Sequence, residues 1–276
     1  MEMKALIEQW HFDTLIIVLI LAIIYLYYLI TGFKEFKHTV CFSLAIFLFL
    51  LVEFSPLNNL GMRYFSAHMI SHVVILLICG PLLVISLEVQ NISPLHDRLF
   101  QLSSFLSRHS WLAWLSGVGI MWLWHIPAVF DGSMNAMQGS FSFIPVLQGG
   151  SMLLAGIVFS WPLFGPFKAA HLQPLSGIVY LFTACISCSL LGLLITFAPL
   201  NTWQFYTMMH RPLDNPWNIS LIQDQQAAGL IMWVPCCFVY LSGCLYLLYR
   251  WFAETDLPKK SVNIQLKTSI IDHDGR

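Results

Sequence analysis

Long apolar stretches constrain this chain more than any other feature of its sequence. Hydrophobic residues make up 58% of its 276 positions and charged residues 10%, far from the even mixture of a soluble domain. A helix needs about 20 apolar residues to cross the roughly 30 Å of hydrocarbon in a bilayer. Segments of this kind recur at 13–31, 39–54, 66–87, 110–130, 144–164, 176–199 and 226–250. The sequence therefore predicts an all-α, polytopic integral membrane protein, folded as a seven-transmembrane-helix bundle.

The seven predicted spans leave no room for a separate soluble domain. We expect one membrane domain over residues 1–251 and a polar cytoplasmic tail over residues 252–276. The segment before the first span carries Glu2, Glu8 and Asp13. It lacks the basic start and the small-residue cleavage site of a signal peptide, so we expect the first span to remain as an anchor.

Basic residues are distributed unequally between the two sides of the predicted bundle. Ten of the thirteen fall in the tail and in the loops after the first, third and fifth spans, whereas Lys4, Arg63 and Arg211 fall on the other side. Cytoplasmic loops carry the excess of lysine and arginine. The sequence thus predicts a multi-pass plasma-membrane protein, in contact with membrane lipid, with its N-terminus outside and its C-terminus in the cytoplasm. Without a basic face outside these loops, we expect no nucleic-acid partner.

Three histidines, His68, His72 and His125, lie inside the predicted spans. An imidazole in hydrocarbon is costly and usually functional. The predicted topology places His72 and His125 roughly 8–9 Å below the outer surface at 1.5 Å per residue. Asp224 enters the last span from that same side, and Pro127 predicts a helix kink just after His125. Because the topology was assigned without these residues, their common depth indicates a shared site.

The spacing of the histidines indicates a metal site. His68 and His72 are four residues apart and project from one helix face, and His125 from another helix completes a three-nitrogen ligand set. Imidazole binds copper, zinc, iron and nickel, and the neighbouring thioether of Met69 favours copper(I). We therefore predict a copper site with ligands His68, His72 and His125, in which Asp224 accepts a hydrogen bond from an imidazole. The alternative is that the histidines are hydrogen-bonded polar groups of the bundle interior.

The seven cysteines receive a structural interpretation. All of them fall within predicted spans, so a disulfide framework is not expected. Cys185 and Cys188 have the spacing of a redox or metal pair but lack the βαβ context of such a motif. We interpret them as small buried hydrophobic residues.

Four motifs follow one another between residues 66 and 241. They are His68-Met69-Ile70-Ser71-His72 with Cys79-Gly80-Pro81-Leu82-Leu83-Val84, Trp122-Leu123-Trp124-His125-Ile126-Pro127, Leu153-Leu154-Ala155-Gly156 through Trp161-Pro162, and Asp224-Gln225 through Val234-Pro235. In this order they resemble segments of the CtaG-type (caa3-type) cytochrome c oxidase assembly factor family, among them H-M-x-x-H…P-L-L-V, W-x-W-H-x-P and D-Q-x-x-A-G-x-x-M-W-x-P.

The resemblance implies a bacterial plasma-membrane protein that is not an enzyme. It implies an assembly factor for a haem–copper cytochrome c oxidase, with the oxidase subunits as partners and copper bound or delivered at the outer face. Two positions depart from the family pattern. Gln148-Gly149 stand where the family has Glu-His, so a fourth imidazole is missing, and Cys236-Cys237 stand where it has Gly-Gly.

Two functions from other classes also fit a membrane bundle with buried histidines. In the first, His72 and His125 are the axial ligands of a haem that supports electron transfer. In the second, the chain is a retinal photoreceptor, but the last span contains no lysine for a Schiff base, and this function is excluded. The oligomeric state and the oxidase served stay open at this stage.

Overall fold

The structure is a computed structural model, and it describes residues 14–32, 35–87, 94–137, 143–209 and 218–274. The described residues form helices and turns without a strand, which confirms the all-α fold. The helices are α2 (Thr14–Thr31), α3 (Phe36–Phe54), α4 (Pro56–Gly61), α5 (Phe65–Val74), the π-helical η1 (Ile75–Cys79), α6 (Gly80–Ile85), α7 (Pro94–Arg108), α8 (Ser110–His125), α9 (Pro127–Met137), α10 (Ile144–Phe164), the 3-10 helical η2 (Lys168–Ala170), α11 (Pro174–Phe197), α12 (Gln204–Met209) and α13 (Leu221–Asp274).

Each of the seven predicted spans contains a helix, but the count of seven membrane crossings is not confirmed. Among the described residues, five helical segments are long and apolar enough to cross a bilayer: α3, the continuous segment Phe65–Ile85, α10, α11 and Leu221–Ala253. The pair α8 and α9 makes a sixth if it is counted as one span. The chain is a multi-pass membrane protein on this evidence.

The predicted span at 110–130 is broken rather than continuous. α8 ends at His125, and α9 continues at an angle of 72°. Ile126 between them has extended backbone angles, φ −60° and ψ 124°. The residue before a proline is disfavoured in the helical region because the proline ring crowds it. Pro127 therefore explains the break, and the predicted kink after His125 is confirmed.

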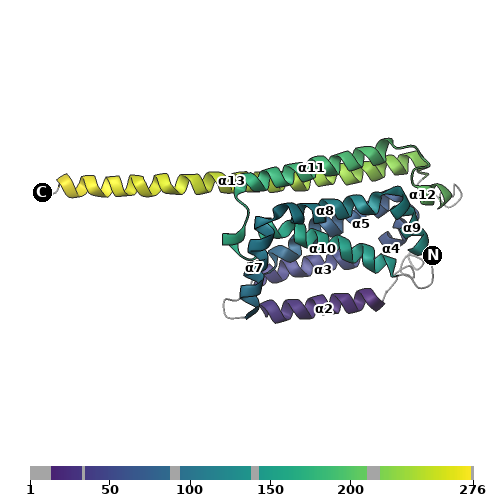
Figure 1. The fold of residues 1–276 in the computed structure, drawn as a ribbon, viewed down its shortest axis with the longest axis horizontal. Coiled ribbons are helices and arrows are strands. Elements are labelled where there is room, and N and C mark those ends of the chain that lie inside the picture. Colours follow the sequence, from purple (N-terminus) through teal and green to yellow (C-terminus); the bar gives the residue numbers. More distant parts are fainter. Residues whose placement is uncertain (1–13, 33–34, 88–93, 138–142, 210–217, 275–276) are drawn as a thin grey trace.

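The helices pack as an elongated bundle with α11 and α13 along one side and α2 along the other (Figure 1). α5, α8 and α10 lie between these two sides. α11 and α13 approach closely at two glycines, since a Cβ atom added to Gly229 would lie 2.5 Å from the Gly192 carbonyl oxygen. In membranes, helices associate through such close backbone packing at small residues.

The two ends of the bundle differ. α4, α9, α12 and the start of α13 gather at one end, which we call the α4–α9–α12 end, while α7 lies at the other (Figure 1). Beyond α7, α13 extends far out of the bundle as a single helix to Asp274. The helix therefore includes most of the segment predicted as a polar tail, and the division at residue 251 stays a prediction.

Candidate metal centre

α5 and α8 bring the three predicted histidines together inside the bundle. His72 Nδ1 lies 3.3 Å from His125 Nε2, and the rings of His68 and His72 are 4.4 Å apart between centroids. The three side chains are exposed by 8% or less. The shared location deduced from topology is therefore present in the fold, whereas metal binding stays a prediction.

The hydrogen bonds of His125 fix its tautomer. Its Nδ1 lies 2.6 Å from the carbonyl oxygen of Met121, and a carbonyl can only accept, so Nδ1 carries the proton. Nε2 then keeps its lone pair, which faces His72 Nδ1 and the sulfur of Met69 at 3.1 Å. The Nε2 lone pair of His125 thus points toward two other atoms that could bind a metal, His72 Nδ1 and the Met69 sulfur.

Three donor atoms converge here with separations that suit one metal ion. His–metal bonds of about 2.0–2.1 Å in tetrahedral geometry place two nitrogens roughly 3.3–3.4 Å apart, close to the 3.3 Å between His72 and His125. The third donor is the Met69 thioether, whose side chain is fully buried. Among the described residues, no three histidine, cysteine, aspartate or glutamate side chains are themselves grouped as a metal site. The convergence therefore depends on the sulfur as well as the imidazoles.

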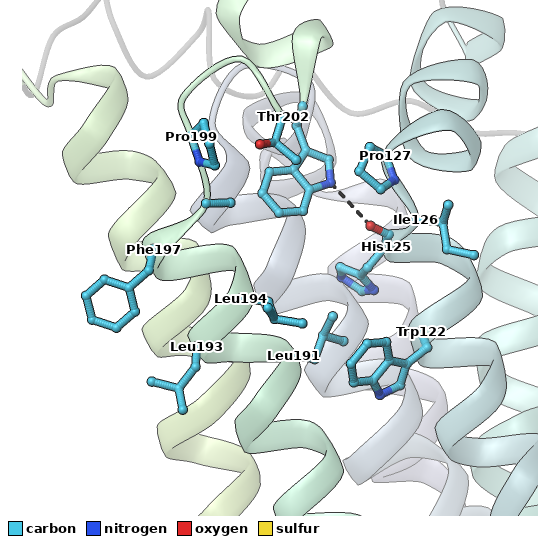
Figure 2. Close-up of a pocket in the computed structure, with 12 residues that line it drawn as sticks. Trp122, His125, Ile126, Pro127, Leu191, Leu193, Leu194, Phe197, Pro199 and Thr202 are labelled. Carbon is cyan, nitrogen blue, oxygen red and sulfur yellow. Dashed lines mark hydrogen bonds between the residues drawn. The ribbon is translucent and has the colours of Figure 1, made fainter.

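The chain around His125 is held by a contact with the loop after α11. Trp203 Nε1 donates to the carbonyl oxygen of His125, at 3.3 Å; a dashed line in Figure 2 marks a hydrogen bond to this oxygen. Beside this contact lies an apolar groove of about 610 Å³ between α8 and α11, in which Trp122 and His125 face Leu191 and Leu194. One side of the histidine cluster therefore borders an apolar space.

The other side of the cluster borders a polar cavity of about 480 Å³, which we call the polar chamber. It is enclosed by the ends of α3 and α9, by α4 and α5, and by the start of α10, and its polar lining groups belong to Glu53, Asn58, Asn59, His68, Ser71, His72 and Gln148. The Nε2 atoms of His68, His72 and Gln148 are buried and lack a hydrogen bond of good geometry among the described residues, although Gln148 lies beside His72. These buried atoms need a ligand, water or ion as a partner.

Asp224 has a different partner from the one predicted. Its carboxylate is 3% exposed and accepts from the backbone N–H groups of Phe65 and Ser66, at 2.6 and 3.0 Å, and from the Ser66 hydroxyl at 2.5 Å. The expected hydrogen bond to an imidazole is absent from the described contacts. Because Tyr64, the N-cap residue of α5, provides no side-chain cap, the buried start of α5 takes its acceptor from α13. Asp224 thus caps the helix that carries His68 and His72.

Tyr206 of α12 covers this capped helix start. Its ring lies 4.9 Å from that of Phe65, and its hydroxyl donates to the Gly61 carbonyl oxygen at 2.5 Å. Burial and the nearby Asp224 carboxylate raise the pKa of Tyr206 well above its ordinary value. The hydroxyl therefore stays protonated and remains a donor at neutral pH.

Two residues of the chamber escaped prediction from sequence, Glu53 and Gln148 in its wall. In the sequence, Gln148 departs from the family pattern, but nothing there indicates that it lies beside His72. The sequence did contain a signal for Glu53, because it is an acidic residue within the predicted span 39–54. Ionisable residues in membrane spans usually face the bundle interior and mark functional positions.

Comparison with known families gives a match over most of the chain. The sequence model of the family described as "Cytochrome c oxidase caa3 assembly factor (Caa3_CtaG)" matches residues 23–254. No curated protein and no solved structure matches. The matched range includes the three histidines, Met69, Asp224 and the polar chamber.

Proposed function

The chain belongs to the cytochrome c oxidase caa3 assembly factor family, and we propose that it binds copper(I) at His68, His72 and His125 and passes it to the oxidase during assembly. Copper is the cargo in this proposal. The observation that carries it is the convergence of His72 Nδ1, His125 Nε2 and the Met69 sulfur inside a buried cluster that also contains His68.

Buried nitrogen lone pairs favour a cation over a packing role. Leaving a buried polar group without a partner costs about 1–3 kcal/mol, and among the described residues the Nε2 atoms of His68 and His72 have no hydrogen bond of good geometry. A histidine that serves only as a bundle-interior polar group would be hydrogen-bonded between helices. Each neutral imidazole has one nitrogen lone pair, so a metal ion at this cluster would accept the Nε2 lone pair of His125 and the Nδ1 lone pair of His72.

The sulfur of Met69 supports copper(I) among the metals that imidazole binds. Its thioether lies 3.1 Å from His125 Nε2, and soft sulfur ligands select copper(I). To bind between His72 Nδ1 and His125 Nε2, His72 must carry its proton on Nε2, next to Gln148 and the polar chamber. His72 therefore moves its proton from Nδ1 to Nε2 when copper binds, whereas His125 keeps its proton on Nδ1.

The contact between His72 and His125 disfavours the haem alternative. Two imidazole nitrogens on opposite sides of one iron, at about 2.0 Å each, would be roughly 4 Å apart, with the porphyrin plane between them. His72 Nδ1 and His125 Nε2 are 3.3 Å apart, so a porphyrin has no room between the two rings.

We further infer that the α4–α9–α12 end, near the histidines, faces the outside of the cell. α7, which carries Arg98 and Arg108, lies at the opposite end of the bundle, and η2, which carries Lys168, contacts α7. Cytoplasmic loops carry the excess of basic residues, and this distribution supports release of the cargo to the outer face of the bacterial plasma membrane.

The test is metal binding by the purified protein, compared with His72→Ala and with Cys188→Ala as a matched control. Cys188 is a buried α11 residue whose thiol contacts the Met232 carbonyl oxygen, away from the histidines. We expect one copper(I) per chain in the wild type and in Cys188→Ala, and about 10–100-fold weaker binding in His72→Ala.

In the bacterial host, His72→Ala and His125→Ala should lower oxidase activity while the abundance of the protein is largely kept. Equal oxidase loss in His72→Ala and Cys188→Ala, or full activity in both at normal protein levels, would contradict the copper proposal. A Soret band in the purified protein would favour haem instead.

A further inference from the structure

The polar chamber contains an acidic group that the proposed copper ligands do not include. Among the described residues that line it, the carboxylate belongs to Glu53, in the last turn of α3. His68 and His72 line the same chamber. The Glu53 carboxylate and the imidazoles of His68 and His72 therefore share one cavity, although they come from different helices.

A cation bound by these histidines needs a counter-charge. Neutral imidazoles donate lone pairs but carry no charge, and an isolated charge inside a membrane protein is strongly unfavourable unless it is paired. Asp224 does not line the chamber; its oxygens accept hydrogen bonds from the start of α5. Among the described residues that line the chamber, the acidic one is Glu53.

Because Gly149 of α10 has no side chain, the Glu53 carboxylate has room beside it. A Cβ atom at Gly149 would lie 2.7 Å from Glu53 Oε1, so the carboxylate occupies the space that a larger side chain at 149 would fill. The neighbouring Gly150 has no atom within 4 Å of such a Cβ. The glycine at 149 thus allows Glu53 to reach from α3 across to α10.

We propose that Glu53 is the counter-charge of the metal site and that the chamber is the route by which the cation reaches the histidines. One carboxylate balances one positive charge, so the site favours a monovalent soft cation over a divalent one. This inference rests on the proposed function and adds to it the residue that neutralises the cargo.

The experiment titrates the full-length purified protein with silver(I), as a redox-inert monovalent ion, and with zinc(II). Glu53→Gln keeps the size of the side chain and removes its charge. Gly149→Ala keeps the charge and displaces the carboxylate, whose flexible end can move without a backbone shift. Gly150→Ala is the matched control, because its added methyl group meets open space.

We expect silver(I) to bind wild type and Gly150→Ala with the same affinity, within twofold, and at least tenfold more tightly than zinc(II). Glu53→Gln should bind silver(I) at least tenfold more weakly, and Gly149→Ala at least threefold more weakly. Unchanged silver(I) affinity in both variants, or zinc(II) binding as tight as silver(I), would overturn the inference.

The result separates this inference from the function on which it rests. Loss of silver(I) binding in His72→Ala together with full binding in Glu53→Gln would leave the copper site standing and remove Glu53 from it. Absence of silver(I) binding in the wild type would remove both. If Glu53→Gln fails to fold, as judged by its thermal unfolding, Gly149→Ala decides the outcome alone.

Discussion

Replacing Asp224 tests how α13 holds the helix that carries two of the histidines. In Asp224→Ala the start of α5 loses three hydrogen bonds, those from the Phe65 and Ser66 amides and from the Ser66 hydroxyl. Loss of a helix N-cap costs about 0.5–2 kcal/mol, and a buried N–H left without an acceptor costs about 1–3 kcal/mol. Because Phe65 is buried, we expect the free energy of unfolding to fall by about 2–4 kcal/mol.

The matched control is Ser66→Ala, which removes the hydroxyl bond and leaves both amides bound to Asp224. Its cost should be about 0.5–1.5 kcal/mol. The assay is thermal unfolding in detergent, followed by far-ultraviolet circular dichroism, in which each kcal/mol corresponds to about 2–4 °C for a chain of this size. Asp224→Ala should unfold on the order of 5–10 °C below the wild type.

Asp224→Ala should also weaken copper(I) binding, because His68 lies three residues after Phe65 on the helix that is released. Asp224→Asn keeps one acceptor oxygen, and its stability should lie between those of the wild type and Asp224→Ala. An Asp224→Ala protein that unfolds within 2 °C of the wild type, or no lower than Ser66→Ala, would refute the capping role.

Two further predictions concern topology and packing. In a cysteine-free background, Arg63→Cys should react with a membrane-impermeant thiol reagent from outside the cell and Lys168→Cys only after the membrane is opened; the reverse pattern would invert the predicted orientation. Gly229→Ala should lower the thermal stability of the detergent-purified protein, because its methyl group meets the Gly192 carbonyl oxygen between α11 and α13. Gly132→Ala, with open space around its added methyl group, should unfold like the wild type.

The sequence by itself predicted most of the helical segments and a shared level for His72 and His125 along their helices. Backbone polar groups in hydrocarbon must be satisfied within each segment, so an apolar run of about 20 residues has few alternatives to a helix. A proline interrupts such a helix locally, and Pro127 therefore marked the break after His125 correctly. The rise per residue predicts similar depths for His72 and His125, and in the fold the two side chains lie side by side, with His72 Nδ1 3.3 Å from His125 Nε2.

The tertiary structure decided which side chains meet across helices. Hydrophobicity along a span does not specify which helix lies beside it or how the two are rotated, because lipid and helix interiors are equally apolar. Asp224 was therefore placed at the right end of the right helix, yet its partner is the start of α5 rather than an imidazole. Glu53 lies beside Gly149, a neighbour far away in sequence. The space for its carboxylate exists because α10 has no side chain at the position that Glu53 Oε1 approaches.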